Sequence, residues 1–248
     1  MVIYYDQVDS TNRIAKELVM EGKPSGTVVC AGMQSAGKGQ YGRTFNSPPG
    51  GLYFSLLLKP NLDIEYLPLV TLATGLACRE VIYSAFNIQT QIKWPNDIYL
   101  CDKKLAGILC ENIDFRSAAE NALATVVIGA GLNINNTKAD FPLEIQPIVT
   151  TLFDHLKIQV DLHSLRTLLV DAVVKNVIIL SENRQLLLAQ WQQHDYLYKK
   201  SIIYTAGSMT LRGTGLGISS QGYYCIQDNQ GAEHCVVGGQ LRLASDTN

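Results

Sequence analysis

The sequence is poor in charged residues, and neither sign predominates. Only 17% of its 248 residues are charged, and 20 Lys and Arg stand against 22 Asp and Glu, which gives a net charge of −2. A protein that binds nucleic acid through a broad basic face carries a surplus of cations, so this function class is disfavoured. The hydrophobic share of 47% is typical of a packed globular chain and excludes global disorder.

Signals for secretion, membrane insertion and metal binding are also missing. The N-terminus MVIYYDQVDS lacks the basic stretch and apolar core of a secretory signal, and no segment is typical of a membrane span. The six cysteines form no C-x-x-C pair and the four histidines do not cluster with them, which argues against a zinc site. We therefore expect a cytoplasmic protein whose cysteines are mostly buried small hydrophobic residues in a reducing compartment.

Apolar periodicity predicts an α+β sheet domain followed by a small all-β unit. The first expected helix begins at Asp9 or Ser10 and ends at Gly22. The further expected helices are 67–86, 147–156 and 161–190, and the expected strands are 27–31, 52–58, 91–94, 97–100, 105–111 and 123–130. From residue 201 onward, short apolar runs alternate with turn signals. We therefore expect two domains, 1–196 and 197–248.

A glycine-rich polar stretch at 32–51 is too long for a routine connection between strands. Its segment 32–39 approximates the phosphate-loop pattern G-x-x-x-x-G-K-[ST], but Gly39 stands where the pattern requires a hydroxyl. The stretch then continues into QYGRTFNSPPGG, which cannot open a helix. Its glycines could form an anion-binding nest with Lys38 and Arg43 as cations; the alternative is a surface loop with two charges.

The stretch 93–97 (KWPND) lies beside a predicted hairpin whose far strand carries Lys104. Such a hairpin can bring Asp97 and Lys104 together, with Lys93 close by. A cation beside a carboxylate suits a reaction in which a phosphate is neutralised and an amine is deprotonated. The alternative is a surface ion pair of little energetic value.

Two further polar segments have a structural and a functional interpretation. Residues 9–12 (DSTN) open the first predicted helix. They are either an N-cap or a set of hydroxyl and amide groups that hold a polar ring of a ligand. Residues 129–135 (GAGLNIN) end a predicted strand, as a bulge or as a wall for a flat purine.

Taken in order, six motifs resemble the biotin–protein ligase family over residues 9–135. These motifs are DSTN, QSAGKGQYGR, GLYFSLLL, KWPNDIYL, KKLAGILCE and GAGLNIN. The resemblance implies a fold shared with class II aminoacyl-tRNA synthetases, with a small C-terminal SH3-like β-barrel. It also implies that biotin and MgATP give biotinyl-5'-AMP, whose biotin is transferred to a lysine of the biotin carboxyl carrier protein of acetyl-CoA carboxylase.

The resemblance assigns roles to individual residues. Lys104, Asp97 and Arg43 would be catalytic: Lys104 facing the biotin carboxylate and the α-phosphate, and Asp97 orienting or deprotonating the incoming amine. The implied biotin-binding residues are Ser10, Thr11, Asn12, Gln34, Gly37, Lys38, Gly39, Gln40, Lys104 and Gly107. The implied ATP-binding residues are Lys38, Arg43, Phe45, Lys93, Asn96, Lys104 and Asn133, with Asn133 at the adenine. No residue is assigned to Mg²⁺.

The sequence departs from the family pattern in two places. The usual loop is G-R-G-R-x-G-R followed by an aromatic residue, and here Lys38 and Gln40 replace two of its arginines. Lysine lacks the planar fork of arginine and glutamine lacks the charge, so we expect looser retention of the adenylate. Some family members also carry a DNA-binding helix-turn-helix domain before DSTN, whereas eight residues precede Asp9 here. We expect a monofunctional ligase that is not a repressor. A homodimer formed through a sheet edge is possible, and the sequence does not decide it.

Two alternatives come from other function classes. The first is a lipoate or octanoate ligase on the same sheet, against which the polar set Ser10, Thr11 and Gln34 argues. The second is a non-catalytic biotin-binding module or regulator, in which Lys104, Asp97 and Arg43 would be unnecessary.

Overall fold

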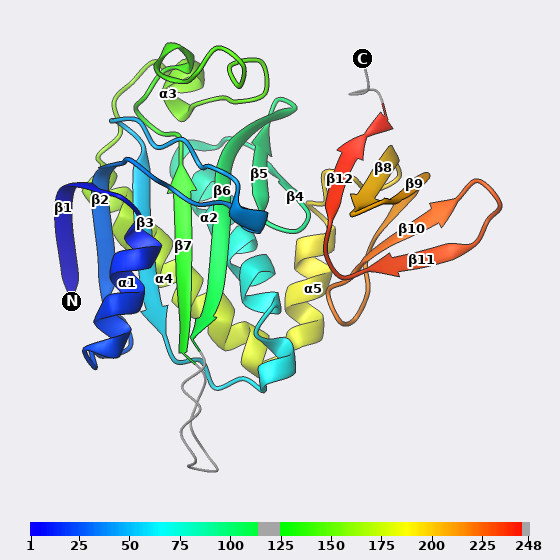
Figure 1. Ribbon diagram of the computed structural model, residues 1–248, viewed down its shortest axis with the longest axis horizontal. Coiled ribbons are helices and arrows are strands. Elements are labelled where there is room, and N and C mark those ends of the chain that lie inside the picture. Colours follow the sequence, from blue (N-terminus) through cyan, green and yellow to red (C-terminus); the bar gives the residue numbers. More distant parts are fainter. Residues whose placement is uncertain (114–124, 245–248) are drawn as a thin grey trace.

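The computed structural model describes residues 1–113 and 125–244, which form two β-sheets with helices around the larger one (Figure 1). The larger sheet has seven strands in the order β1-β2-β3-β7-β6-β5-β4. Its strands are β1 (Val2–Val8), β2 (Val28–Gln34), β3 (Leu52–Leu58), β4 (Gln91–Lys93), β5 (Asp97–Leu100), β6 (Lys103–Ile113) and β7 (Thr125–Leu132). β1 and β2 are parallel and the other neighbours antiparallel, so the sheet is mixed and the expected α+β class is confirmed.

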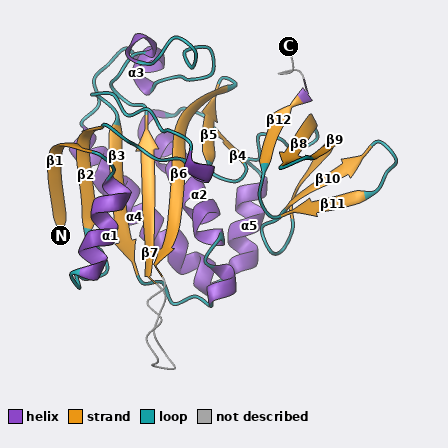
Figure 2. Ribbon diagram, viewed as in Figure 1, coloured by secondary structure: helices purple, strands orange, loops and turns teal. Residues whose placement is uncertain are grey.

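Helices cover both faces of the large sheet (Figure 2). α1 (Thr11–Met20) packs on one face, against β2, β3 and β7. α2 (Leu69–Phe86) and α4 (Leu162–Glu182) pack on the other face, and α5 (Arg184–Gln192) packs against both of them. The short α3 (Leu152–Leu156) follows the loop that leaves β7. The sheet is therefore the middle layer of the larger part of the molecule.

The central strands are apolar at nearly every position because both of their faces are covered. All residues of β3 and β7 are buried. Val29, Leu57 and Val127 pack with α1, whereas residues one position along, such as Cys30 and Leu56, join the core under α2 and α4. This alternation is the two-residue period of a strand.

α2 is the one helix in the described ranges with the length and hydropathy of a membrane span. It packs against both the sheet and α4, and 61% of it is buried in the fold.

The smaller sheet is antiparallel, with the strand order β11-β10-β9-β8-β12. Its strands are β8 (Ser201–Ala206), β9 (Met209–Ile218), β10 (Tyr224–Asp228), β11 (Glu233–Val236) and β12 (Gln240–Leu243). The outer strands β11 and β12 do not pair within the described residues, so the sheet is not a closed barrel. The domain boundary at 196/197 stays a prediction.

The structure corrects three of the expected elements. The expected helix 147–156 is helical only over α3, because residues 148–150 form a bridge to Lys104 instead. The expected helix 161–190 is divided at Asn183, whose side chain accepts a hydrogen bond from Leu186 N and caps α5. The expected strand 27–31 extends to Gln34 as β2.

Two further differences concern strand ends. β1 was not predicted, since it is a largely exposed edge strand with a weak apolar pattern. The strand expected at 123–130 is β7, which runs from Thr125 to Leu132, and residues 123–124 lie outside the described residues.

The expectation that most cysteines are buried small hydrophobic residues is wrong. Only Cys30 and Cys78 are buried among the four free cysteines. Cys225 and Cys235 form a disulfide, because the antiparallel pairing of β10 with β11 places them directly opposite each other.

Asp195 joins the two sheets. It is the residue bridged to Ile92 of β4, and its carboxyl accepts a hydrogen bond from Leu197 N at 2.9 Å and another from Tyr224 Oη of β10 at 2.9 Å. Burial of this carboxyl raises its pKa to about 6, although both hydrogen bonds act in the opposite direction. The folded protein therefore binds a proton here more tightly than the unfolded chain does.

We expect Asp195→Asn to remove part of the pH dependence of stability. With the folded pKa above the ordinary 3.8, the contribution of Asp195 is full below about pH 4 and is lost as the pH rises through about 6. Relative to wild type, the free energy of unfolding of the variant should rise by on the order of 2–3 kcal/mol between pH 4 and pH 7. Urea unfolding at several pH values measures this, and parallel curves for the two proteins would contradict it.

Candidate active site

A hairpin-like flap, residues 37–45, extends from the end of β2 and lies over the large sheet (Figure 1). Its two arms are joined by the hydrogen bonds Phe45 N to Gly37 O at 2.8 Å and Gly39 N to Arg43 O at 2.7 Å. The tip is a 3₁₀ turn at Gln40–Gly42. The chain after Lys38 forms a hairpin, whereas a phosphate loop would lead into a helix, so this interpretation is excluded. The hydrogen bonds between the two arms also distinguish the flap from an irregular surface loop.

Glycines beneath the flap make room for its aromatic residue. A Cβ on Gly131 of β7 would overlap the Phe45 ring, and one on Gly107 of β6 would come within 2.9 Å of it. A Cβ on Gly129 would overlap the Asn12 side chain. β7 keeps regular register with both neighbours up to Leu132, so the bulge interpretation of 129–135 does not hold over its strand residues. The side chains of Phe45 and Asn12 lie against this part of the strand.

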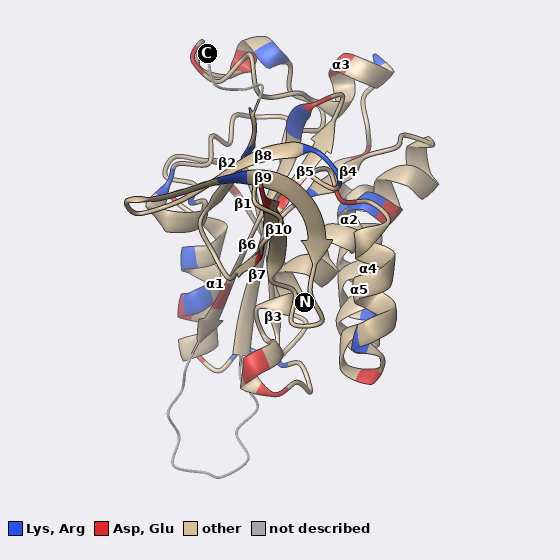
Figure 3. Cartoon of the chain, turned by 90° about the vertical axis from the view of Figure 1, so that its right-hand side faces the viewer, with Lys and Arg blue, Asp and Glu red and all other residues tan. Residues whose placement is uncertain are grey.

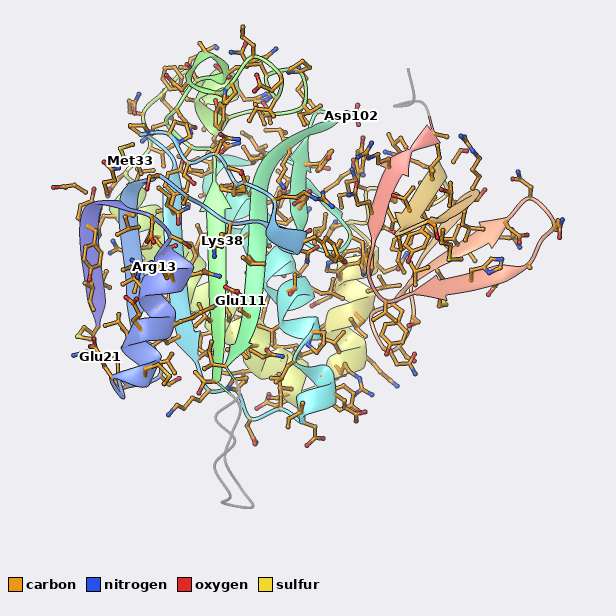
Figure 4. All side chains as sticks on the ribbon, in the orientation of Figure 1. Arg13, Glu21, Met33, Lys38, Asp102 and Glu111 are labelled. Atoms are coloured by element: carbon orange, nitrogen blue, oxygen red, sulfur yellow. A yellow bond between two sulfur atoms is a disulfide. The ribbon has the colours of Figure 1, made fainter. Side chains whose placement is uncertain are left out.

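One cavity lies beneath the flap, on the sheet face that carries α1. This flap cavity is lined by Ser10, Thr11, Asn12, Gln34, Lys38, Gly39, Gln40, Arg43, Thr44, Phe45, Asn96, Asp97, Lys104, Gly107, Ile108, Leu109, Gly129, Ala130 and Gly131. Of the predicted site residues, three are not in this lining: Gly37, Lys93 and Asn133. Figure 4 labels Lys38 over β6 and β7, beside α1.

A hydrogen-bonded network fixes the polar end of the cavity at the start of α1. Gln34 Oε1 accepts from Thr11 N at 2.8 Å and from Thr11 Oγ1 at 3.2 Å, and Gln34 Nε2 donates to Ser47 Oγ at 2.8 Å. The buried Ser55 Oγ lies 2.8 Å from Thr11 Oγ1. Ser10 stands at the N-cap position without a side-chain cap bond, so the N-cap interpretation does not explain its hydroxyl.

The side chain of Asn12 is committed within the protein. Its Nδ2 donates to Leu109 O at 3.1 Å and to Glu111 Oε2 at 2.8 Å. Its Oδ1 lies 2.6 Å from Ser55 Oγ. These bonds use both amide hydrogens, so Asn12 holds α1 against β3 and β6, and its implied contact with biotin stays a prediction.

Lys104 and Asp97 form an ion pair at the cavity wall, as the predicted hairpin indicated. Lys104 Nζ lies 2.6 Å from Asp97 Oδ1, and the two side chains are 30% and 21% exposed. Asp97 pairs in register with Gly107, and a bulge then brings Lys104 opposite Tyr99. The backbone of Lys104 bonds to Ile148 and Thr150, and its ammonium lies 5.7 Å from the centre of the Phe45 ring. The ammonium is therefore held from several sides.

Two recesses adjoin the flap cavity. The first, the cationic cleft, lies between β4, β5 and β12, and its lining includes Arg43, Lys93, Lys104 and Arg242. Lys93 stands opposite Asp97 in the pairing of β4 with β5, and its Nζ donates to Tyr99 Oη at 3.0 Å. These cations surround a space between the two sheets that an anion can enter.

The second recess, the Asn133 recess, is mainly apolar. It is lined by Thr44, Phe45, Asn46, Lys104, Asn133, Phe141, Ile145, Ile148 and Val149. Asn133 Nδ2 donates to Thr150 O at 3.1 Å, whereas its buried Oδ1 has no hydrogen-bond partner within the described chain. An unpartnered acceptor between apolar and aromatic side chains suits a flat ring with an amino group.

Sequence reasoning missed three residues of this region. Ser55 is the one serine in the otherwise apolar and aromatic strand LYFSLLL. A polar residue in a buried strand is a signal that could have identified it. Arg242 reaches the cationic cleft from β12, and nothing in the sequence indicated this. Tyr41, at the flap tip, accepts a hydrogen bond from Gly239 N at 2.7 Å and so ties the flap to the smaller sheet.

Comparison with known proteins shows the family of the chain. Residues 4–133, which contain the flap-cavity lining, match the model of the biotin/lipoate A/B protein ligase family. The bifunctional ligase/repressor BirA of Bacillus subtilis is 32% identical over 243 residues, which cover 93% of this chain and 70% of that protein. The chain belongs to the biotin/lipoate A/B protein ligase family.

Other family members place the chain on the biotin side. The biotin–[acetyl-CoA-carboxylase] ligase of Mycobacterium tuberculosis is 31% identical over 137 residues, or 52% of this chain and 46% of that protein. The biotin protein ligase of Aquifex aeolicus, solved in complex with biotin and ATP, has a TM-score of 0.85 and 27% identity, covering 98% of this chain and 99% of that one. This chain is an enzyme of the biotin–protein ligase type.

Proposed function

We propose that the enzyme forms biotinyl-5'-AMP from biotin and MgATP and then transfers biotin to a lysine of the biotin carboxyl carrier protein of acetyl-CoA carboxylase. The observation that carries the proposal is the Lys104–Asp97 ion pair in the wall of the flap cavity. The known homologues named for acetyl-CoA carboxylase support the choice of carrier.

The first step needs positioned charge and no nucleophilic side chain. The biotin carboxylate attacks the α-phosphorus of ATP, and pyrophosphate leaves. Negative charge on the α-phosphate oxygens then faces the ammonium of Lys104, which the protein holds in place before the reaction. Arg43, Lys93 and Arg242 in the cationic cleft would neutralise the departing phosphates.

The polar groups of the site divide between the two substrates. The ureido ring of biotin would bond to the hydroxyls of Ser10 and Thr11 and to the remaining amide hydrogen of Gln34, all of which line the flap cavity. The adenine would occupy the Asn133 recess, with its amino group donating to the unpartnered Asn133 Oδ1.

Magnesium fits this scheme as a companion of ATP. Within the described ranges no three His, Cys, Asp or Glu side chains lie together as a metal site. Asp97 is the one carboxylate in the flap-cavity lining, and it is paired with Lys104. Mg²⁺ in nucleotide sites is held largely by phosphate oxygens and water, and we propose that it enters in this form.

In the second step the amine of the carrier lysine attacks the mixed anhydride and AMP leaves. The attacking amine must lose a proton, and the Asp97 carboxylate is the acceptor that lines the cavity.

The resemblance of the smaller sheet to an SH3-like unit, and of the larger one to class II synthetases, stays part of the proposal.

Incubation with biotin, MgATP and a biotin carboxyl carrier domain tests the function. We expect pyrophosphate release that depends on biotin, and mass spectrometry should show one biotin on the carrier. Pyrophosphate release with lipoate but not with biotin would indicate a lipoate ligase. Tight biotin binding without pyrophosphate release would indicate a non-catalytic binding module.

We expect the flap to release the adenylate readily and Gln40→Arg to reduce this release. Gln40 lines both the flap cavity and the cationic cleft, and an arginine there would add a charge-assisted bond to the intermediate. Release of biotinyl-5'-AMP should slow by ~10-fold, and a streptavidin blot should show less labelling of unrelated proteins. Gln91→Arg, on the exposed surface of β4, is the control. A wild-type enzyme that labels no unrelated protein at high concentration would count against the hypothesis.

The absence of repressor activity, the cytoplasmic location and a homodimer stay predictions. The net charge of −2 supports the first of these, and Figure 3 shows Lys and Arg interspersed with Asp and Glu. A gel shift with a specific DNA would contradict it.

A further inference from the structure

The large sheet has a second cavity, on the face opposite the flap cavity. It measures about 610 Å³, and its lining is Val2, Tyr4, Cys30, Ala31, Gly32, Pro49, Gly50, Gly51, Leu52, Tyr53, Leu162, His163 and Arg166. Cys30 and Leu52 belong to the core under α2 and α4, whereas the flap cavity lies on the α1 side. The two cavities share no residue.

This Arg166 cavity exists because the helices leave the sheet edge uncovered. α4 packs against β3, and β1 and β2 extend beyond it (Figure 1). Val2 and Tyr4 of β1 are 50% and 62% exposed and form the rim. The interior is largely apolar, with Leu52 of the sheet and Leu162 of α4 in its walls, and its size is that of a small-molecule site.

A guanidinium lies in this apolar space without a counter-ion. Arg166 is 9% exposed, and within the described residues it has no carboxylate partner. Its one neighbour of note is the Cys30 thiol; burial raises the pKa of that thiol, and Arg166 offsets this only in part. Cys30 therefore stays neutral at neutral pH and does not balance the charge.

Asp161, which precedes the lining residues Leu162 and His163, does not balance it either. Asp161 caps the start of α4 by accepting from His163 N at 3.0 Å and from Ser164 Oγ at 2.5 Å, so its charge is used at the helix end. His163 can only add positive charge. A buried charge without a partner is costly, and an anion that binds here would remove that cost.

We propose that the Arg166 cavity binds a small monocarboxylate with a short apolar body, its carboxylate on Arg166 and its body against Leu52 and Leu162. The lining residues account for both the carboxylate and the apolar body of this ligand. The guanidinium offers the planar fork that suits a carboxylate, and the apolar walls favour a chain or ring over a free inorganic anion. The site is separate from the proposed biotin and ATP sites and does not depend on their assignment.

Three probes test the two halves of the ligand on the wild-type protein. Hexanoate carries both parts, hexanamide carries the apolar body without the charge, and acetate carries the charge without the body. Calorimetry should show hexanoate binding at least ~10-fold more tightly than either of the others. Equal binding of hexanoate and hexanamide, or no binding of hexanoate, would overturn the proposal.

The position of the probe is checked by methyl NMR. Hexanoate should shift the methyl signals of Val2, Leu52 and Leu162 and leave those of Ile108 and Leu109 in the flap cavity unchanged. Shifts confined to the flap-cavity methyls would place the probe there and refute the site.

Two substitutions separate the charge of Arg166 from its packing. Arg166→Met should reduce hexanoate affinity by ~10-fold, to the level of hexanamide, whereas Arg166→Lys, which keeps the charge but loses the planar fork, should reduce it by less than that. Thermal unfolding checks that both variants are folded, and if Arg166→Met is not, the comparison of probes on the wild type still decides. Unchanged affinity in a folded Arg166→Met variant would overturn the proposal.

Discussion

Replacement of Lys104 by alanine is expected to reduce biotin-dependent pyrophosphate release by ~10²–10³-fold, a loss of about 3–4 kcal/mol of transition-state stabilisation. Lys104 is a cation that the structure holds firmly in the flap-cavity wall, through Asp97, the Phe45 ring and the backbone at 148–150. Water that fills the space left in the Lys104→Ala variant cannot replace the positioned positive charge. The rate should fall at saturating biotin and ATP, because the interaction grows as the α-phosphate gains charge.

Lys103→Ala is the matched control. Lys103 precedes Lys104 on β6 and does not line the flap cavity. The Lys103→Ala enzyme should retain nearly the full rate of pyrophosphate release. Thermal unfolding of both variants separates a catalytic loss from a folding defect, and an unchanged pyrophosphate rate in a folded Lys104→Ala enzyme would remove Lys104 from this role.

Asp97→Asn is expected to slow biotin transfer from preformed biotinyl-5'-AMP to the carrier by ~10²–10⁴-fold. The amide cannot accept the proton of the attacking amine. Adenylation should fall less, because the substitution keeps the Lys104 ammonium in the cavity and removes only its carboxylate partner. Single-turnover transfer and pyrophosphate release measure the two steps separately.

The pH profile of transfer distinguishes a proton acceptor from a merely structural carboxylate. In the Asp97→Asn variant the transfer rate should rise with pH toward the ordinary lysine pKa of about 10.4, because hydroxide or buffer then removes the proton. The control is Asp102→Asn, since Asp102 is exposed and its left-handed φ of 59° is one that asparagine also adopts. Full activity of the Asp97→Asn variant in both steps would refute the assignment.

The local elements that bound the site could be predicted because their signals are local. The helix α2, the strand β3 and the hairpin that joins Asp97 to Lys104 follow from apolar spacing and turn residues within a few positions. The edge strand β1 could not be found in this way, because only one side of it pairs and few of its residues are buried. The break at Asn183 depends on a cap that competes weakly with helix continuation.

The kinds of chemical group available to this protein follow from its amino-acid order, because the six motifs supply the hydroxyls, amides, cations and carboxylate that the family requires. How those groups are used depends on how the chain packs in three dimensions. Packing commits Asn12 to holding α1 and places Phe45 on the glycines of β6 and β7. The fold also brings Arg242 into the cationic cleft and places Arg166 in an apolar cavity. Such contacts join residues far apart in the chain, and their geometry is fixed by sheet register and helix coverage, which no local pattern encodes.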